Sequence, residues 1–214
     1  EGKAVGFGDL LRLADRVEGL KRIRFMSPHP HYLDDAMIEA MAECKSVCEF
    51  LHMPVQSGSD RILKLMRRNY TVESYLRRIE RLKKAIPNIV LSTDIIVGFP
   101  TETEEDFKLT LSLIESLAIV SAYCFKYSPR ESTEAASRVD DVAPEIKEER
   151  LSRLNGLVDH MTQEALTSQI GTVAEVLAEQ PNFGLTRTGF KVRWGCSADF
   201  GELIKVKVGG ATRR

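Results

Sequence analysis

Between Lys21 and Tyr127 the sequence alternates strand-like segments with helix-like segments. The strand-like segments are short runs rich in Val, Ile, Leu and Phe, and they cover residues 21–26, 50–55, 89–97 and 119–127. Side chains suited to capping a helix follow each of the first three, at Asp34, Ser59, Thr71 and Thr103. Because helices join consecutive strands, this order predicts an α/β fold with a parallel sheet and right-handed crossovers.

Two architectures fit this alternation: an open doubly wound sheet and a (β/α) barrel. In both, ligands bind at the carboxyl ends of the strands. Each strand-like segment here ends in a polar or turn-forming cluster, which reads SPHP, QSGS, GFPTE or YSPRES. A glycine directly after a buried strand, such as Gly98, lets the backbone approach a flat ligand. The sequence therefore predicts a ligand site at this end of the sheet.

The chain changes character after Ser128. Pro144 begins a long amphipathic helix that ends before Gly171, and three strand-like segments follow, TVAEVLAE, TGFKVRW and ELIKVKV. We therefore divide the chain into an α/β domain with its closing helix (residues 1–170) and a small β-rich domain (residues 171–214). The second part is too short for a deep core of its own, so we expect a partial barrel or a sheet docked on the first domain.

Charge is segregated along a chain that is close to neutral overall. Lys and Arg total 30 against 31 Asp and Glu, for a net charge of −1, which excludes a globally basic nucleic-acid binder. Residues 61–84 nevertheless carry nine basic and two acidic side chains, and residues 171–214 carry seven and four. These two stretches predict local contact with a polyanion, and solvated surface is the alternative.

The remaining features bound the cellular context and the metal chemistry. No apolar run approaches the ~20 residues of a membrane span, the first residues lack a secretory signal, and cysteines are too sparse for a disulfide scaffold, so we expect a cytoplasmic protein. Cys44 and Cys48 have only His52 nearby and lack a fourth ligand, so we interpret them as buried hydrophobes and assign no metal ligand. His29 and His31 are either ligand-site residues or incidental loop residues.

Four blocks of the sequence carry a family resemblance: HPHYLDDAMIEAM, VCEFLHMPVQSGSDRILKLMRRNYTVESY, STDIIVGFPTETEEDF and CFKYSPREST. They resemble the radical S-adenosylmethionine (SAM) domain of tRNA methylthiotransferases. The most similar branch adds a methylthio group to N6-isopentenyladenosine beside the anticodon. The tail, from GTVAEVLAE to GELIKVKV, resembles the start of the family's TRAM domain, a small β-barrel thought to bind tRNA. The resemblance covers about residues 20–210.

The resemblance implies a partial (β/α)6 barrel, of which this chain supplies about four parallel strands, followed by an incomplete TRAM-like domain. It also implies two [4Fe–4S] clusters, one of them held by a CxxxCxxC motif that this sequence lacks. We therefore expect the cluster ligands to lie outside this chain, which would be the C-terminal part of a longer enzyme and inactive alone. The segment RESTEAA also departs from the RxGTxAA usual in the family.

The resemblance assigns SAM to the carboxyl ends of the strands. It places Gln56, Ser57 and Gly58 beside the ribose and methionine of SAM. It places Val97, Gly98 and Phe99 beside the adenine ring, and the backbone of Tyr127 and Ser128 against the edge of that ring. In this family, reductive cleavage of SAM gives a 5′-deoxyadenosyl radical that takes hydrogen from the adenine C2 carbon of the substrate. The protein supplies orientation and excludes water.

The resemblance also gives the basic stretches a partner, the anticodon stem-loop of a tRNA. The residues expected to meet its phosphates are Arg67, Arg68, Lys191, Arg193, Lys205 and Lys207. A reductant protein such as flavodoxin or ferredoxin is a second implied partner. Other readings stay open: a methylthiotransferase acting on threonylcarbamoyl-adenosine of tRNA or on a ribosomal protein, and a non-catalytic RNA-binding remnant of a barrel.

Overall fold

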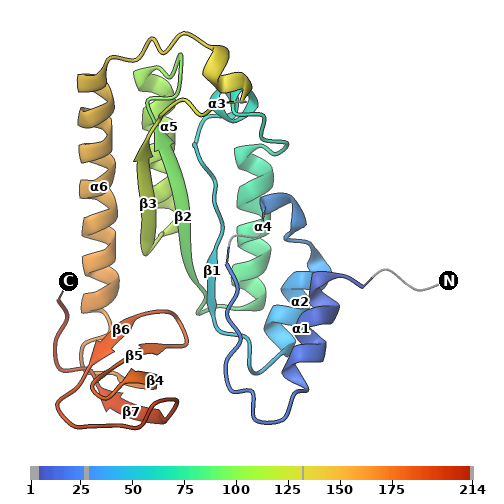
Figure 1. Ribbon diagram of the computed structural model, residues 1–214, viewed down its shortest axis with the longest axis vertical. Helices are drawn as coiled ribbons and strands as arrows, with labels where there is room; N and C mark the ends of the chain where they lie inside the picture. Colours follow the sequence, from blue (N-terminus) through green and yellow to red (C-terminus); the bar gives the residue numbers. More distant parts are fainter. Residues whose placement is uncertain (1–4, 27–28, 132, 213–214) are drawn as a thin grey trace.

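A three-stranded parallel sheet with covering helices forms the larger part of the molecule (Figure 1). The computed structural model describes residues 5–26, 29–131 and 133–212. The strands lie in the order β1 (Phe50–His52), β2 (Val90–Val97) and β3 (Ser121–Lys126). The helices are α1 (Phe7–Asp15), α2 (Asp35–Glu43), α3 (Asp60–Leu65), α4 (Val72–Ala85), α5 (Glu104–Leu117) and α6 (Pro144–Thr167), with 3-10 turns η1 (Pro30–Tyr32) and η2 (Glu134–Ser137). The predicted parallel α/β architecture is confirmed.

The capping residues begin the helices where the sequence predicts. Asp34 accepts a hydrogen bond of 2.8 Å from the backbone N of Met37 at the start of α2. Ser59, Thr71 and Thr103 cap α3, α4 and α5 in the same way. Each side chain takes up an N–H that the first helical turn leaves without a partner, so each helix starts at a fixed residue.

The first predicted strand, residues 21–26, is reduced to a single position. Ile23 forms a parallel bridge with Val47, through bonds of 2.6 Å to the carbonyl oxygen of Ser46 and 3.0 Å from the backbone N of Cys48. The described sheet thus has three strands and one bridging residue, where four strands were expected. Arg22 and Arg24, on either side of Ile23, donate to carbonyl oxygens of residues 185 and 186 near the C-terminal end of the chain.

The core lies between the parallel sheet and its helices. Alternate residues of β2, such as Ile95 and Val97, point toward the helices and are fully buried. The opposite face of the sheet is open, because Tyr123 and Phe125 of β3 are 55% and 52% exposed. Within the described chain, therefore, helices cover one face of the sheet and leave the other accessible.

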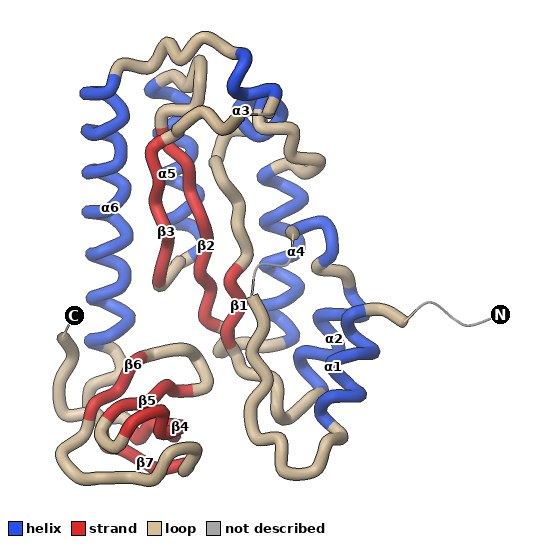
Figure 2. Tube along the Cα trace, viewed as in Figure 1, coloured by secondary structure: helices blue, strands red, loops and turns tan. Residues whose placement is uncertain are grey.

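The C-terminal residues form a four-stranded antiparallel sheet in the order β6-β5-β4-β7 (Figure 2). Its strands are β4 (Val173–Gln180), β5 (Phe183–Thr186), β6 (Lys191–Arg193) and β7 (Leu203–Lys207). The sequence predicted three strands and missed β5. That strand has only four residues, one of them Gly184, and it follows β4 after two residues, so no clear alternation marks it. The division of the chain at residue 170 stays a prediction.

Arginines connect this small sheet to the segment around Ile23 and to Glu49, which directly precedes β1. Arg22 donates to the carbonyl oxygen of Leu185 at 2.6 Å, and Arg24 donates to that of Thr186. In the other direction, Arg187 makes a two-pronged ion pair with Glu49 at 2.8 Å. The small sheet therefore docks at the amino ends of the parallel strands, at the opposite end from the predicted ligand site.

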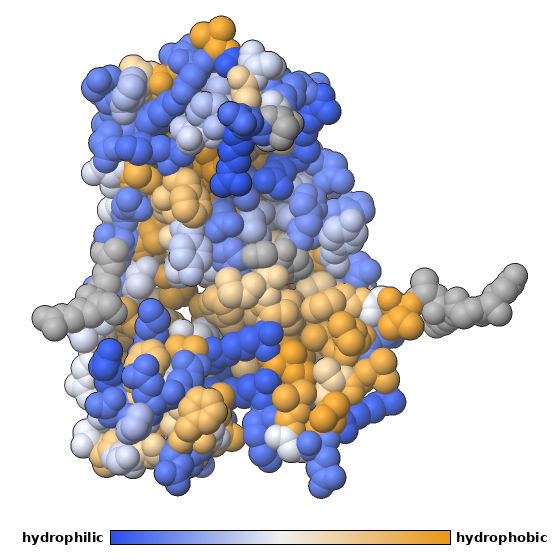
Figure 3. Space-filling model, in the orientation of Figure 1, coloured by the Kyte–Doolittle hydropathy of each residue, from blue (hydrophilic) through white to orange (hydrophobic). Residues whose placement is uncertain are grey.

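Surface hydropathy is uneven. The outer side of α1 exposes Leu10 and Leu13, and Val17 is exposed just after the helix. Apolar residues gather at the lower right of Figure 3, where Figure 1 shows α1. Among the described residues, no helix is long and apolar enough to cross a membrane.

Candidate functional site

The carboxyl ends of β2 and β3 bring five of the predicted SAM-binding residues together. The backbone N of Tyr127 donates to the carbonyl oxygen of Val97 at 2.8 Å, which extends the pairing one residue beyond β3. The rings of Phe99 and Tyr127 meet edge to face with centroids 5.0 Å apart. Gly98 and Ser128 are the neighbours of these residues in the chain, and Ser128 is exposed. These residues thus share one edge of the sheet.

Gly98 occupies a turn that accepts only glycine. Its φ of +69° is left-handed, and a Cβ atom would lie 2.3 Å from Cγ of Lys147. Its backbone N donates to Oε2 of Glu102 at 2.7 Å, and the same oxygen accepts from Nη1 of Arg150 at 2.9 Å. Burial raises the pKa of Glu102, although its partners oppose that shift. Two residues of α6, Lys147 and Arg150, therefore hold the turn from behind.

Gln56 lies beside β2 in a conformation that is uncommon for a residue other than glycine. Its φ is +73°, its backbone N donates to the carbonyl oxygen of Asp94 at 2.9 Å, and its own carbonyl accepts from Ile96 at 3.0 Å. Sheet pairing continues here beyond β1. Left-handed residues of this kind cluster at functional sites. Contact of Gln56 with SAM stays a prediction.

Ser57 and Gly58 pack against α5. The hydroxyl of Ser57 lies 3.4 Å from that of Thr110, which also accepts from the backbone N of Gly58 at 2.9 Å. A Cβ on Gly58 would lie 2.5 Å from the carbonyl oxygen of Leu109, so only glycine permits this approach. These contacts give both residues a packing role, and their contact with SAM stays a prediction.

Sequence reasoning missed the carboxylate that ties these loops together. Asp106 accepts from the hydroxyl of Ser59 at 2.6 Å and forms an ion pair with Arg61. Burial alone would raise the pKa of Asp106, but hydrogen bonds from Arg61, Ser59 and Thr103 hold it well below its usual value. The signal in the sequence was weak, because an acidic residue in the first turn of a helix is common.

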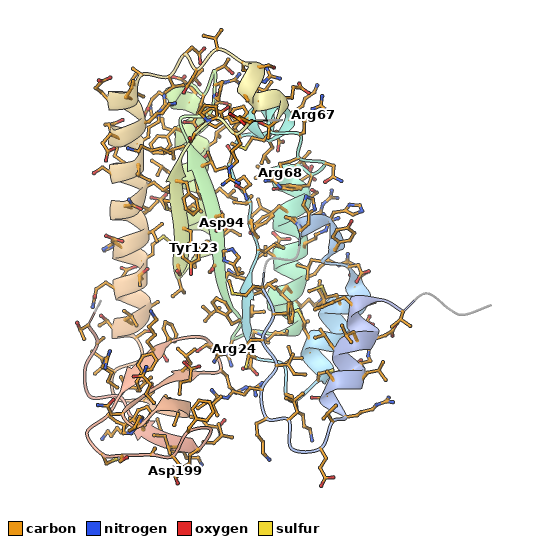
Figure 4. All side chains as sticks on the ribbon, in the orientation of Figure 1. Arg24, Arg67, Arg68, Asp94, Tyr123 and Asp199 are labelled. Carbon is orange, nitrogen blue, oxygen red and sulfur yellow. The ribbon has the colours of Figure 1, made fainter. Side chains whose placement is uncertain are left out.

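Arg67 and Arg68 lie at the carboxyl-end side of the sheet (Figure 4). Arg67 has a left-handed φ of +56° and pairs with Glu134 of η2. Arg68 lies near His29, whose pKa is lowered by burial and by this positive charge. The charge of Arg67 is thus partly balanced, while its side chain stays 75% exposed.

The four basic residues predicted in the tail lie on one face of the antiparallel sheet. Directly paired residues in such a sheet point to the same side, and the pairs Lys191–Leu185, Leu185–Leu177 and Leu177–Leu203 link β6 to β7. The basic residues exposed on this face are Lys191, Arg193, Lys205 and Lys207, and one exposed acidic residue, Glu175, lies on it opposite Lys205. The guanidinium of Arg193 also lies 5.3 Å from the ring centre of Phe183. The structure therefore forms a basic face, at the other end of the molecule from Arg67.

The cysteines do not form a metal site in the described part of the chain. Cys44 ends α2 and Cys48 lies beyond it, and both are buried thiols. No group of three or more His, Cys, Asp or Glu among the described residues could hold a metal ion. The described residues therefore do not fit an iron–sulfur cluster.

A polar group in the middle of the open sheet face was also missed. His52 of β1 contacts Ser92 and Asp94 of β2, at 2.5 Å and 3.2 Å, and its ring lies 5.7 Å from that of Tyr123 in β3. The histidine is buried and the other partners are alternate residues of the strands. No motif marks this group, because His52 is at least 40 positions away from each of its partners in the sequence. The residues meet only through strand pairing.

Comparison with known proteins agrees with this arrangement. The radical SAM superfamily matches residues 6–114 of the chain. The tRNA-2-methylthio-N(6)-dimethylallyladenosine synthase of Alkaliphilus oremlandii is 45% identical over 95% of this chain and 45% of its own length. The protein of the same name from Protochlamydia amoebophila is 46% identical over 83% of this chain and 39% of its length. The chain thus spans less than half the length of these curated relatives.

A solved structure shows the same fold at low sequence identity. Coproporphyrinogen III oxidase from Escherichia coli, titled a radical SAM enzyme, superimposes with a TM-score of 0.52 at 18% identity, over 63% of this chain and 31% of its own. The parallel sheet, its glycine-bearing strand ends and the match over residues 6–114 lead to one conclusion. The chain belongs to the radical SAM superfamily.

Proposed function

We propose that this chain is part of a radical SAM enzyme that adds a methylthio group to C2 of N6-isopentenyladenosine, beside the anticodon of tRNA. The observation that carries the proposal is the left-handed Gly98 turn joined to Tyr127 at the carboxyl ends of β2 and β3, in a chain 45% identical over 95% of its length to a relative named for this reaction. A reductant protein such as flavodoxin or ferredoxin and a cytoplasmic location belong to the same proposal.

In this proposal, the residues of this chain bind the nucleoside part of SAM. The left-handed Gly98 turn lies at the end of β2, where the rings of Phe99 and Tyr127 meet edge to face. We assign the carbonyl oxygens of Tyr127 and Ser128 as acceptors for the amino group at the edge of the SAM adenine. Bound SAM, once reduced through a cluster, supplies the radical that starts the reaction. Because the described residues offer no cluster site, its ligands are assigned outside this chain.

The proposal assigns RNA binding to two basic regions. The basic face of Lys191, Arg193, Lys205 and Lys207 can meet the phosphates of a stem. Arg67, at the reactive end, can meet phosphates near the target base. Phosphate contacts fix orientation without reading sequence, so they suit an enzyme whose target is one modified base.

Nucleoside analysis of tRNA tests the proposed reaction. Deleting the gene is expected to remove the 2-methylthio group from isopentenyladenosine, and the full-length gene is expected to restore it. A full-length Gly98→Val variant is expected to fail, because the turn cannot accept a Cβ. An unchanged level of the methylthio nucleoside in the deletion strain would refute the proposal. Loss of the methylthio group from threonylcarbamoyl-adenosine, or from a ribosomal protein, would instead show that the enzyme acts on that substrate.

A further inference from the structure

The open face of the parallel sheet combines exposed aromatic rings with one carboxylate. Residues paired in a parallel sheet point to the same side, and Asp94 pairs with Tyr123 while Ile96 pairs with Phe125. Asp94 and Ile96 are partly exposed, whereas both aromatic rings are more than half exposed. Figure 4 shows Asp94 and Tyr123 side by side at the middle of the sheet. This face therefore combines exposed aromatic rings with one partly exposed carboxylate, and the serines of the Ser92–Ser121 pair lie on the same side.

His52 fixes the orientation of that carboxylate. Its Nε2 lies 3.2 Å from Oδ1 of Asp94, and its Nδ1 lies 2.5 Å from the hydroxyl oxygen of Ser92. With the proton on Nε2, the ring donates to Asp94 and accepts from Ser92, so both nitrogens are bonded. The side chain of His52 is 3% exposed and that of Asp94 is 26% exposed. The carboxylate is thus held at Oδ1 by a buried histidine and remains partly exposed on the open face.

A group placed in this way is suited to accept a hydrogen bond from a ligand. An ionised carboxylate accepts at both oxygens, and bonds to charged acceptors are among the stronger ones. Exposed tyrosine and phenylalanine rings favour a flat ring stacked on them or an alkyl group packed beside them. Asp94 and Ile96 are two residues apart, about 7 Å along the strand. A ligand nitrogen that carries both an N–H and an alkyl chain can therefore place the N–H at Asp94 and the chain at Ile96.

We propose that this open face binds the base of an N6-alkylated aminopurine, with Asp94 accepting its N6–H and with Phe125 and Ile96 taking the alkyl group. The proposal rests on the proposed function and adds the residues that recognise the target base. Val97, three residues after Asp94, is one of the predicted SAM-binding residues. The base would therefore lie along the strands directly below the cofactor end. His52 is the positioning residue, because it contacts Asp94 from the neighbouring strand and is itself buried.

The most direct test replaces one atom of the ligand. Two labelled anticodon stem-loops are compared, one with N6-isopentenyladenosine at the target position and one with the same alkyl group attached through oxygen, which removes the N–H. Their Kd values for the full-length protein are measured by fluorescence anisotropy without reductant, so that no turnover occurs. We expect the wild-type protein to bind the N–H ligand about tenfold more tightly, and Asp94→Asn to reduce this ratio to about one.

Asp199→Asn is the matched control, because it makes the same chemical change at an exposed position of the small antiparallel domain. It should keep the wild-type ratio. Equal affinity of the wild-type protein for the two ligands overturns the inference even if Asp94→Asn does not fold. A ratio that Asp94→Asn leaves unchanged overturns it as well. If the wild-type protein nevertheless methylthiolates the N6-isopentenyladenosine stem-loop when reductant is added, the proposed function stands, whereas absence of that product refutes the function itself.

Discussion

Glu102 and Arg150 form an ion pair of 2.9 Å in which the two side chains are 1% and 5% exposed. The pair joins the turn after β2 to α6, and the same Glu102 oxygen accepts from Gly98. Removing one partner of a buried pair leaves the other charge without compensation, which usually costs about 3–5 kcal/mol. We expect Arg150→Met to lower the free energy of unfolding by that order, measured by urea denaturation.

Arg153→Met is the control for this change. Arg153 lies on the same helix and pairs with Glu104 and Glu149, but its side chain is 38% exposed. Exposed pairs contribute less than about 1 kcal/mol, so its loss should be small. Equal losses in the two variants would contradict the assigned importance of the buried pair. The double change Glu102→Gln with Arg150→Met should recover part of the stability, because no buried charge remains unpaired.

Asp106 makes stability depend on pH in the acid range. Its pKa in the folded state lies well below the ordinary 3.8, so the unfolded state takes up a proton first as the pH falls. The stabilisation is complete above about pH 5 and is lost as the pH falls toward the lowered pKa. Asp106→Asn should therefore weaken the loss of stability between pH 5 and pH 3, measured by urea unfolding. Asp199→Asn should retain the wild-type profile, and an identical slope for Asp106→Asn would contradict the prediction.

Gly58 and Gly156 should respond in opposite directions to alanine. A Cβ on Gly58 would meet backbone atoms of Leu109 and Thr110 at 2.5 Å, and overpacking of this kind costs about 1–3 kcal/mol. Gly156 lies inside α6 with nothing within 4 Å of a new Cβ, so alanine should stabilise the helix by about 0.5–1 kcal/mol. Thermal unfolding of the two variants measures both effects. Destabilisation by Gly156→Ala would show that this helix position is not free.

The basic face should control how RNA binding depends on salt. Replacing Lys191, Arg193, Lys205 and Lys207 by alanine in the full-length protein should weaken binding of an anticodon stem-loop. It should also flatten the slope of log K against log salt by up to about 3.6, since each of four duplex phosphate contacts would contribute about 0.9. The control exchanges Lys and Arg at the same four positions, which keeps the charge and should keep the slope. An alanine variant with the wild-type slope would remove this face from the interface.

The sequence predicted what depends on local pattern. Helix starts at Asp34 and Thr103 follow from capping chemistry within one turn, and the parallel order follows from the alternation of segments. The reduction of residues 21–26 to one bridge was not predicted. Arg22 and Arg24 contact carbonyls more than 160 residues away, which no local pattern indicates. β5 was missed because four residues are too few to show a period.

The same distinction applies to the site. The turn at Gly98 could be predicted, because a glycine directly after a buried strand is visible in the sequence. The contacts of Lys147 and Glu102 with this turn could not be predicted. The contact between His52 and Asp94 joins two strands separated by 42 positions. Such a contact depends on strand register, and register comes from the whole sheet rather than from either segment.

The arginine contacts that hold the small sheet at the amino ends of the parallel strands have a geometric consequence. β2 alone is eight residues long, about 26 Å, and it separates the basic face from the strand tips. Under the proposed function, an RNA bound by the basic face and modified at the strand tips must span that length. The enzyme would then select a base by its distance from the bound stem as well as by its chemistry.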